Sequence, residues 1–122
     1  MIKIIYCMRR KPTLTRDEFL AYWRDVHGRM MLEHQDALRV ARYAQTAPVD
    51  NHYSPRVERA GVLQEPYDGV AEIYWANDDD FRHSFEHPEA KKVQRLLVED
   101  EARFIDHARS ARWICQEDEV IG

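Results

Sequence analysis

The sequence predicts an α+β fold, a ferredoxin-like βαββαβ sandwich in which helices cover one face of a four-stranded antiparallel sheet. The first observation behind this prediction is a β-type apolar pattern in four short segments, residues 2–9, 39–47, 70–76 and 111–120. The second is a helical apolar pattern in the two regions 15–37 and 77–104. The chain has 122 residues, the length of one domain, so we expect a single unit spanning residues 1–122.

The N-terminal part of the chain predicts a strand followed by a capped helix. Residues 2–9 are β-branched and aromatic, and the strand ends before the breaker Pro12. Thr15 and Glu18 have the spacing of a capping box, in which each side chain satisfies a backbone N–H of the first helical turn. We therefore expect a helix from Thr15 to about Ala37.

Two more strands and a long connection are expected next. Residues 39–47 (RVARYAQTA) alternate as a second strand that ends at Pro48, and residues 70–76 (VAEIYWA) form a third strand with one strongly apolar face. Between them, residues 49–69 are rich in Pro, Asn, Ser, Asp and Gly. A loop of this length in a small domain is often functional.

The C-terminal third predicts two helical stretches and a closing strand. Asn77 or Asp78 caps the first stretch, the second runs from about residue 89 to 104, and residues 111–120 form the fourth strand.

Tyr, Ile and Val occupy both sides of several predicted strands. A monomer would leave one apolar face of such a sheet in water. A symmetric homodimer that packs sheet face on sheet face is the simplest way to cover it.

Composition narrows the possible partners. A net charge of −4 and a pI near 5.8 argue against binding to nucleic acid or to an anionic membrane, which normally requires a clustered basic face. Cys7 and Cys115, with no signal sequence or membrane span, indicate free thiols in a cytoplasmic protein. The four glycines form no phosphate-binding loop, so no nucleotide cofactor is expected, and the partner is expected to be a small-molecule substrate.

His27 is the first candidate catalytic residue. Counting from Phe19 at about 100° per residue, Trp23, Val26 and Met30 form an inward stripe with His27 on its edge. A histidine beside a large indole is partly desolvated, which can hold its pKa near working pH and suits a general acid or base. The alternative is a structural histidine bonded to a backbone carbonyl.

His34 is a second candidate, about 10 Å further along the same helix and on a similar face if the helix stays regular. In that case both histidines would face one cavity. The alternative for His34 is a solvated position at the helix end.

Aromatic residues on the strands supply further candidates. Tyr6, Tyr43 and Tyr74 each carry a hydroxyl that can donate to a developing enolate oxygen, or that is simply satisfied within a core. Trp23 and Trp75 are interpreted as walls of a substrate pocket.

Two further groups of residues are candidates for binding. In the loop 49–69, His52 and Arg56 are candidate substrate-binding residues, because the loop can cover a pocket mouth and attract a carboxylate. His83 and His87 have the i,i+4 spacing of a metal-binding pair, but no convincing third ligand accompanies them. A solvated helix face is favoured there, and no metal site is predicted.

Four segments in this order resemble the EthD-like proteins of the dimeric α+β barrel superfamily: FLAYWRDVHG (19–28), RYAQ (42–45), PYDGVAEIYW (66–75) and EDEARFID (99–106). The resemblance implies a ferredoxin-like protomer whose sheet pairs with that of a partner to form a barrel. Related barrels include small cofactorless enzymes that act on polyketide-like and unsaturated carbonyl compounds. One departure is Arg29, where such sequences often have proline after the His-Gly pair, so here the helix can continue past Gly28.

The sequence therefore predicts a homodimeric, cofactor-independent enzyme that moves a proton on an unsaturated or aromatic carbonyl compound, as an isomerase, tautomerase, decarboxylase or cyclase. His27 would exchange the proton and Tyr43 or another tyrosine would stabilise the enolate. One alternative is a non-catalytic binding protein for an aromatic metabolite, and another is haem or metal oxygenation as in some relatives. The pattern leaves open whether the cavity lies between helix and sheet or inside the dimer barrel.

Overall fold

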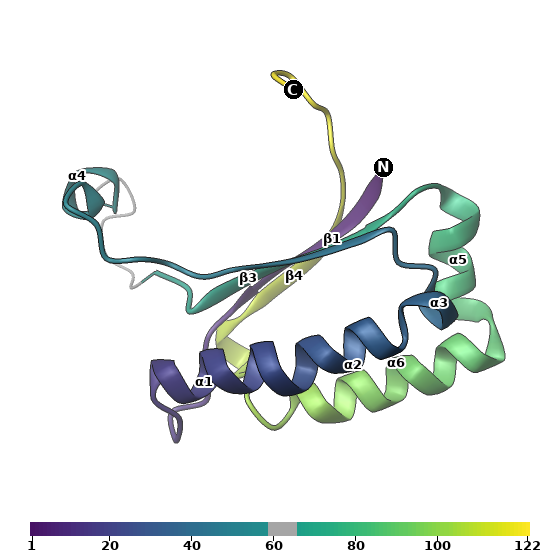
Figure 1. The fold of residues 1–122 in the computed structure, drawn as a ribbon, viewed down its shortest axis with the longest axis horizontal. Coiled ribbons are helices and arrows are strands. Elements are labelled where there is room, and N and C mark those ends of the chain that lie inside the picture. The colour runs from purple at the N-terminus through teal and green to yellow at the C-terminus, as the bar shows by residue number, and fades with distance from the viewer. Residues whose placement is uncertain (59–65) are drawn as a thin grey trace.

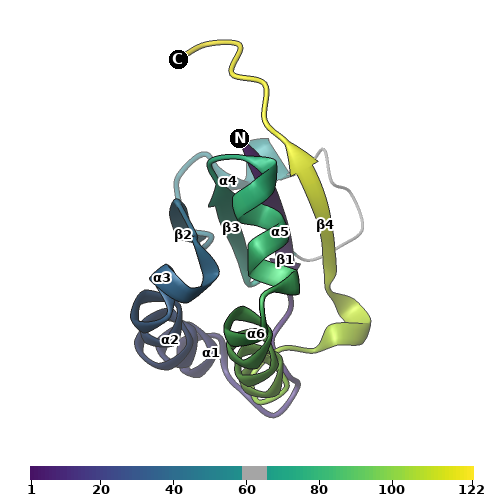
Figure 2. The ribbon, with the colours of Figure 1, turned by 90° about the vertical axis from the view of Figure 1, so that its right-hand side faces the viewer.

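The structure, a computed structural model, describes residues 1–58 and 66–122. Four antiparallel strands form one sheet in the order β2-β3-β1-β4, where β1 is Ile2–Met8, β2 is Arg42–Thr46, β3 is Gly69–Trp75 and β4 is Ala111–Gln116. The main helices form a layer on one side of this sheet (Figures 1 and 2). The predicted ferredoxin-like α+β fold is confirmed.

The first helical region is interrupted in its middle. It consists of α1 (Arg16–Tyr22), a π turn (Trp23–His27), α2 (Gly28–Glu33) and α3 (Gln35–Leu38). Thr15 caps α1, and the predicted capping box is present in both directions, with Thr15 Oγ1 accepting from the Glu18 N–H and Glu18 Oε1 accepting from the Thr15 N–H.

The π turn changes which side chains face the sheet. A π turn bonds i to i+5 and so takes up one more residue than an α-turn. The inward positions therefore continue from Phe19 and Trp23 to His27 and Met31, all buried, whereas Val26 is 39% exposed. The prediction that Val26 belongs to the inward stripe was wrong, because it assumed 3.6 residues per turn throughout, whereas Met30 is partly buried against the core as predicted.

Two hydrogen bonds to the carbonyl of Trp23 stabilise the π turn. The Trp23 carbonyl accepts from the Gly28 N–H and also from Gln45 Nε2 on β2, at 3.0 Å. A Cβ at position 28 would lie 3.0 Å from Gln45 Nε2, so the missing side chain of Gly28 gives the amide its path to the carbonyl.

The second strand begins later than predicted. Arg39 adopts a left-handed conformation (φ 53°) that ends α3, and the Val40 N–H still bonds back to the Gln35 carbonyl. The predicted strand over 39–47 is therefore reduced to β2. In its described part, the predicted loop 49–69 contains a short helix, α4 (Ser54–Glu58), and residues 59–65 of that loop lie outside the described residues.

The later helices follow the prediction closely. Asn77 caps α5 (Asp78–Glu86), its side chain accepting from the Asp80 N–H. α6 spans Pro88–Glu101 and ends three residues before Phe104, which is fully buried beyond the helix. A short 3₁₀ turn, His107–Arg109, leads into β4.

The outer sheet face carries a polar network. Residues of β1 and β3 alternate between the helix layer and this face, which receives Lys3, Glu72 and Tyr74. Lys3 Nζ lies 2.9 Å from Glu72 Oε2 and 2.8 Å from Glu117 Oε1, and the Tyr74 hydroxyl donates to Glu72 at 2.6 Å. The face is thus mixed in character and less apolar than the sequence suggested, because the ion pairs allow charged groups to be partly buried on it.

The structure also bears on the two cysteines and on membrane-spanning helices. Cys7 and Cys115 are free thiols, as predicted. No helix in the described ranges 1–58 and 66–122 has the length and apolar character to cross a membrane.

Gly69→Ala tests how tightly β3 packs against the first helix. A Cβ at this position would lie 2.5 Å from Trp23 Cζ3, so either the indole or the strand must shift. We expect a loss of about 1–3 kcal/mol in the free energy of unfolding, as for other overpacked cores. Urea denaturation measures it, with Gly122→Ala at the exposed terminus as control, and equal stability of the two variants would contradict the packing described.

Candidate active site

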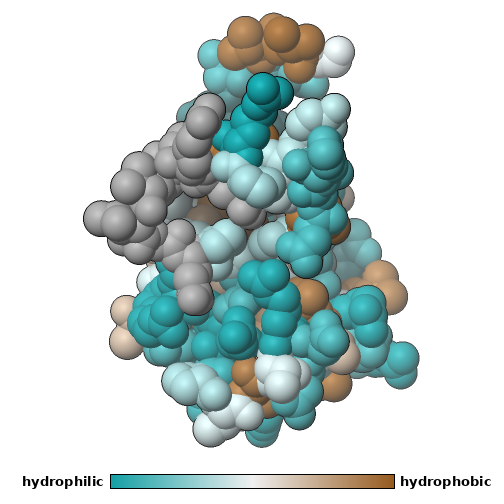
Figure 3. Space-filling model, turned by 90° about the vertical axis from the view of Figure 1, so that its left-hand side faces the viewer, coloured by the Kyte–Doolittle hydropathy of each residue, from teal (hydrophilic) through white to brown (hydrophobic). Residues whose placement is uncertain are grey.

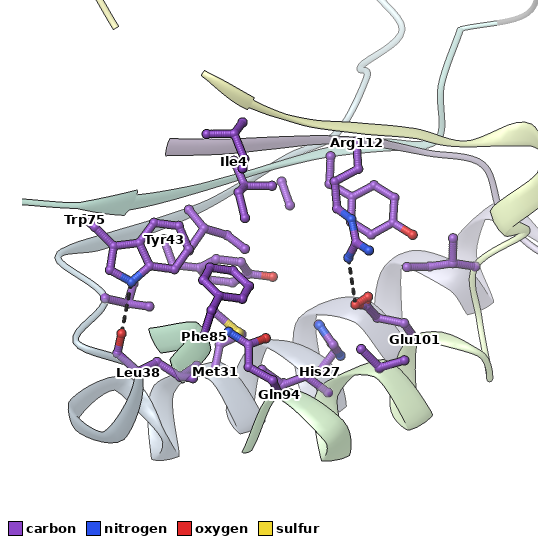
Figure 4. A pocket seen from close by; sticks show the side chains of 18 of the residues that line it. Ile4, His27, Met31, Leu38, Tyr43, Trp75, Phe85, Gln94, Glu101 and Arg112 are labelled. Atoms are coloured by element: carbon purple, nitrogen blue, oxygen red, sulfur yellow. Dashed lines mark hydrogen bonds and ion pairs between the residues drawn. The ribbon is translucent and has the colours of Figure 1, made fainter. Parts of the chain in front are cut away.

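A cavity of about 540 Å³ lies between the helix layer and the sheet (Figure 4). This volume is in the range of small-molecule sites. Its lining is mostly apolar. The side chains in it that can transfer a proton or form hydrogen bonds with a ligand are those of His27, Glu101, Arg112, Tyr6, Tyr43 and Gln94. The cavity is thus formed within one protomer, between helices and sheet, which is one of the two locations that the sequence left open.

His27 reaches this cavity from the π turn. Its side chain is 10% exposed, its ring packs against Phe104 at 5.2 Å between centroids, and Nδ1 lies 2.9 Å from Asp100 Oδ2. A carboxylate only accepts, so Nδ1 carries the proton of the neutral ring and Nε2 keeps its lone pair. Burial lowers the pKa of His27 below its usual 6.5, and the hydrogen bond to Asp100 acts in the opposite direction.

Asp100 is the residue that orients His27, and sequence reasoning missed it. It is buried near the end of α6, where it accepts from the Tyr22 hydroxyl, from Arg103 Nη1 at 3.2 Å and from His27. These donors compensate the buried carboxylate for the loss of water. The helical spacing indicates that Asp100 is buried, because it follows Val93 and Leu97 on the apolar face of the helix.

Tyr43 and Tyr6 both line the cavity. The Tyr43 hydroxyl accepts from Gln45 Nε2 at 3.0 Å, which leaves its own proton free to donate, and burial raises its pKa so that the phenol stays neutral. The Tyr6 hydroxyl is engaged with His107 Nδ1 at 2.9 Å. Burial, with the charge of Glu101, raises the pKa of Tyr6 to about 12.

The two predicted tryptophan walls are also in place. Trp23 and Trp75 both line the cavity and are almost fully buried. Trp75 Nε1 donates to the Leu38 carbonyl at 3.0 Å, which fixes the indole against the end of α3 (Figure 4).

Glu101 and Arg112 form an ion pair at the cavity, and neither residue was selected from the sequence. Arg112 Nη1 on β4 lies 3.6 Å from Glu101 Oε1 on α6 (Figure 4). The guanidinium also lies over the Tyr6 ring, 5.0 Å from its centroid. Burial raises the pKa of Glu101, the Arg112 charge opposes this, and the neighbouring Asp100 adds to it.

Three predicted site residues lie outside this lining. His34 sits at the junction of α2 and α3 and is not among the cavity residues, because the helix does not remain regular up to that point. His52 and Arg56 are exposed beside and within α4, which projects from the end of the sheet away from the helix layer (Figure 1). The described surface at that end is mostly hydrophilic (Figure 3).

His83 and His87 are adjacent as predicted, with their rings stacked at 4.4 Å between centroids. His87 Nδ1 accepts from the Glu89 N–H and so caps α6. Within residues 1–58 and 66–122, no group of three or more His, Cys, Asp or Glu side chains is placed to hold a metal ion.

Solved structures share this fold. An EthD family protein of Bacillus halodurans is 14% identical, with a TM-score of 0.64 over 97% of this chain and 99% of that one. A dimeric ferredoxin-like protein of Bacteroides fragilis is 11% identical (TM-score 0.58, 95% of each chain). SnoaB of Streptomyces nogalater, described as a cofactor-independent oxygenase, is 12% identical (TM-score 0.55, 98% of this chain and 95% of that one).

No curated protein matches the sequence. The family model of the EthD domain matches residues 11–108. This range contains the π turn, β2, β3 and α6, and with them His27, Tyr43 and Asp100. The protein therefore belongs to the EthD domain family.

Proposed function

We propose that the protein is a cofactor-independent enzyme that moves a proton on an unsaturated or aromatic carbonyl compound, with His27 as the base. The observation that carries the proposal is the His27–Asp100 pair, whose Nε2 lone pair is available beside a largely apolar cavity. A neutral imidazole in such surroundings suits the removal of a proton from carbon next to a carbonyl, because water does not compete for it.

The remaining cavity residues support the same chemistry. When His27 takes the proton, negative charge develops on the carbonyl oxygen of the substrate, and the free proton of the Tyr43 hydroxyl can be donated to it. Trp23 and Trp75 offer flat walls for an aromatic or conjugated ring. Return of the proton to the same or another atom gives tautomerisation or isomerisation, and capture of the enolate by a second carbonyl gives cyclisation.

His34, His52 and Arg56 receive no role in this proposal, since they lie outside the cavity. The S. nogalater neighbour, described as a cofactor-independent oxygenase, has the same fold. An enolate made by the same first step is also the kind of electron-rich carbon that reacts with oxygen, so product analysis with and without air belongs to any assay.

We also propose a cytoplasmic homodimer that pairs the outer sheet faces. Two structures of the same fold that are described as dimeric support the homodimer. The two free thiols fit a reducing compartment and so support the cytoplasmic location.

A binding protein for an aromatic metabolite is the second candidate, favoured by the apolar lining and the two indoles. It predicts tight binding of an aromatic ketone without any proton exchange.

Proton exchange of β-tetralone in D₂O separates these candidates. We expect the protein to accelerate loss of the acidic benzylic protons in the NMR spectrum. His27→Gln should slow this by about 100-fold or more, the usual contribution of a general base. His34→Gln, the histidine of the same helical region outside the cavity, is the matched control. Binding of β-tetralone with no exchange by the wild type would contradict the enzyme and support the binding protein.

The pH dependence of this exchange follows from the lowered pKa of His27. The base is active when neutral, so the rate should rise with pH, reach half its plateau below pH 6.5 and stay flat above it. A half-plateau clearly above pH 6.5 would show that a different group acts.

Asp100→Asn tests the orienting role of the carboxylate. The hydrogen bond and the charge of Asp100 both raise the pKa of His27, so their removal should lower that pKa further in an NMR titration. The loss of ring orientation should slow exchange by about tenfold or more. Tyr22→Phe, which removes a different partner of the same carboxylate, should keep the pKa of His27 above that of the Asp100→Asn variant. An unchanged titration in Asp100→Asn would contradict the pairing.

A further inference from the structure

The cavity is lined by a buried carboxyl group, that of Glu101, which the chemistry above does not use. Glu101 is the last residue of α6, and its side chain is 10% exposed. Successive helix residues point about 100° apart. Asp100 therefore lies against the π turn, where it holds His27, while Glu101 extends from the same helix end toward the sheet (Figure 4).

The carboxylate oxygens of Glu101 can accept further hydrogen bonds on the cavity side. Its ion-pair contact within the described chain is with Arg112, at 3.6 Å, which is longer than a hydrogen bond. Buried carboxylates in structural roles are normally surrounded by close donors, as Asp100 is by three. Glu101 instead faces the same space as His27 with its oxygens largely uncommitted.

We propose that Glu101 is a second proton-transfer residue, which makes the enzyme an isomerase for β,γ-unsaturated carbonyl compounds whose oxygen is bound by Arg112 together with the Tyr43 hydroxyl. This inference rests on the proposed role of His27 and adds to it the position at which the proton returns. It also narrows the substrate class, because a single base suffices for exchange at one carbon, whereas two groups are suited to moving a double bond.

The step balances without any further reactant. His27 Nε2 takes a proton from the carbon between the carbonyl and the double bond, and the electron pair passes through the enolate to form the conjugated double bond. Protonated Glu101 then delivers its proton to the γ carbon. One C–H bond breaks, one forms, and His27 and Glu101 return to their starting states by exchange with solvent after product release.

Arg112 couples this step to binding. In the free protein its guanidinium lies beside Glu101 and favours the charged carboxylate, against the effect of burial. The Arg112 side chain is 52% exposed, so it is free to turn toward the carbonyl oxygen of the substrate. Glu101 then loses its counter-charge in an apolar cavity and takes up a proton, which prepares it as the acid.

The test uses the β,γ-isomer of cyclohexenone in D₂O with the full-length protein. The wild type should both exchange the proton of the α carbon and form the conjugated ketone, which is followed by its ultraviolet absorbance. Glu101→Gln should keep exchange within about threefold of the wild type and slow isomerisation by about 100-fold or more. Glu99→Gln, the same change at an exposed position of α6, is the matched control and should behave as the wild type.

Each result separates this inference from the proposed function. Loss of isomerisation with retained exchange in Glu101→Gln supports the inference, since a merely structural role would lower both rates together. Equal isomerisation in Glu101→Gln and wild type would overturn it and leave His27 as the only proton-transfer group. Loss of both rates in a Glu101→Gln variant with a wild-type circular dichroism spectrum and melting curve would also overturn it. No exchange by the wild type would overturn the proposed function and this inference with it.

Discussion

The carbonyl of Trp23 organises the site, because two donors from different parts of the chain meet on it. The Gly28 N–H closes the π turn, and Gln45 Nε2 reaches the same oxygen from the neighbouring strand, through the space that Gly28 leaves open. The same amide also donates to the Tyr43 hydroxyl. One side chain of β2 thus ties together the turn that presents His27 and the phenol proposed to face the same substrate.

The buried polar groups at and beside the cavity differ in how fully they are hydrogen-bonded. Asp100 sits between the helices with every close partner a donor, whereas His27 and Glu101 project into a mostly apolar space with few. Burial acts on both in the direction of the neutral form, lowering the pKa of His27 and raising that of Glu101. Neutral base and neutral acid in one cavity are the states that proton transfer between carbon atoms requires.

Much of the fold could be predicted from the sequence, because strand alternation and the Thr15 cap are local signals. The side chains on the cavity side of the first helix could not all be predicted, since the π turn that exchanges Val26 for His27 depends on Gln45, 22 residues away. His27, Tyr43, Tyr6, Trp23 and Trp75 were nevertheless selected and do line one cavity. Asp100 and Glu101 were not selected from the sequence, although both are buried at the end of α6.

The proposed chemistry requires His27 to be neutral at pH 7, with its proton on Nδ1 toward Asp100 and a free lone pair on Nε2. Long-range proton–nitrogen NMR of the isotope-labelled protein reports this state directly, because protonated and unprotonated ring nitrogens have widely separated shifts. We expect His27 to show a protonated Nδ1 and an unprotonated Nε2 at pH 7, in contrast to a rapidly averaging exposed histidine. A spectrum with Nε2 protonated, as the other tautomer or as the imidazolium, would contradict the account.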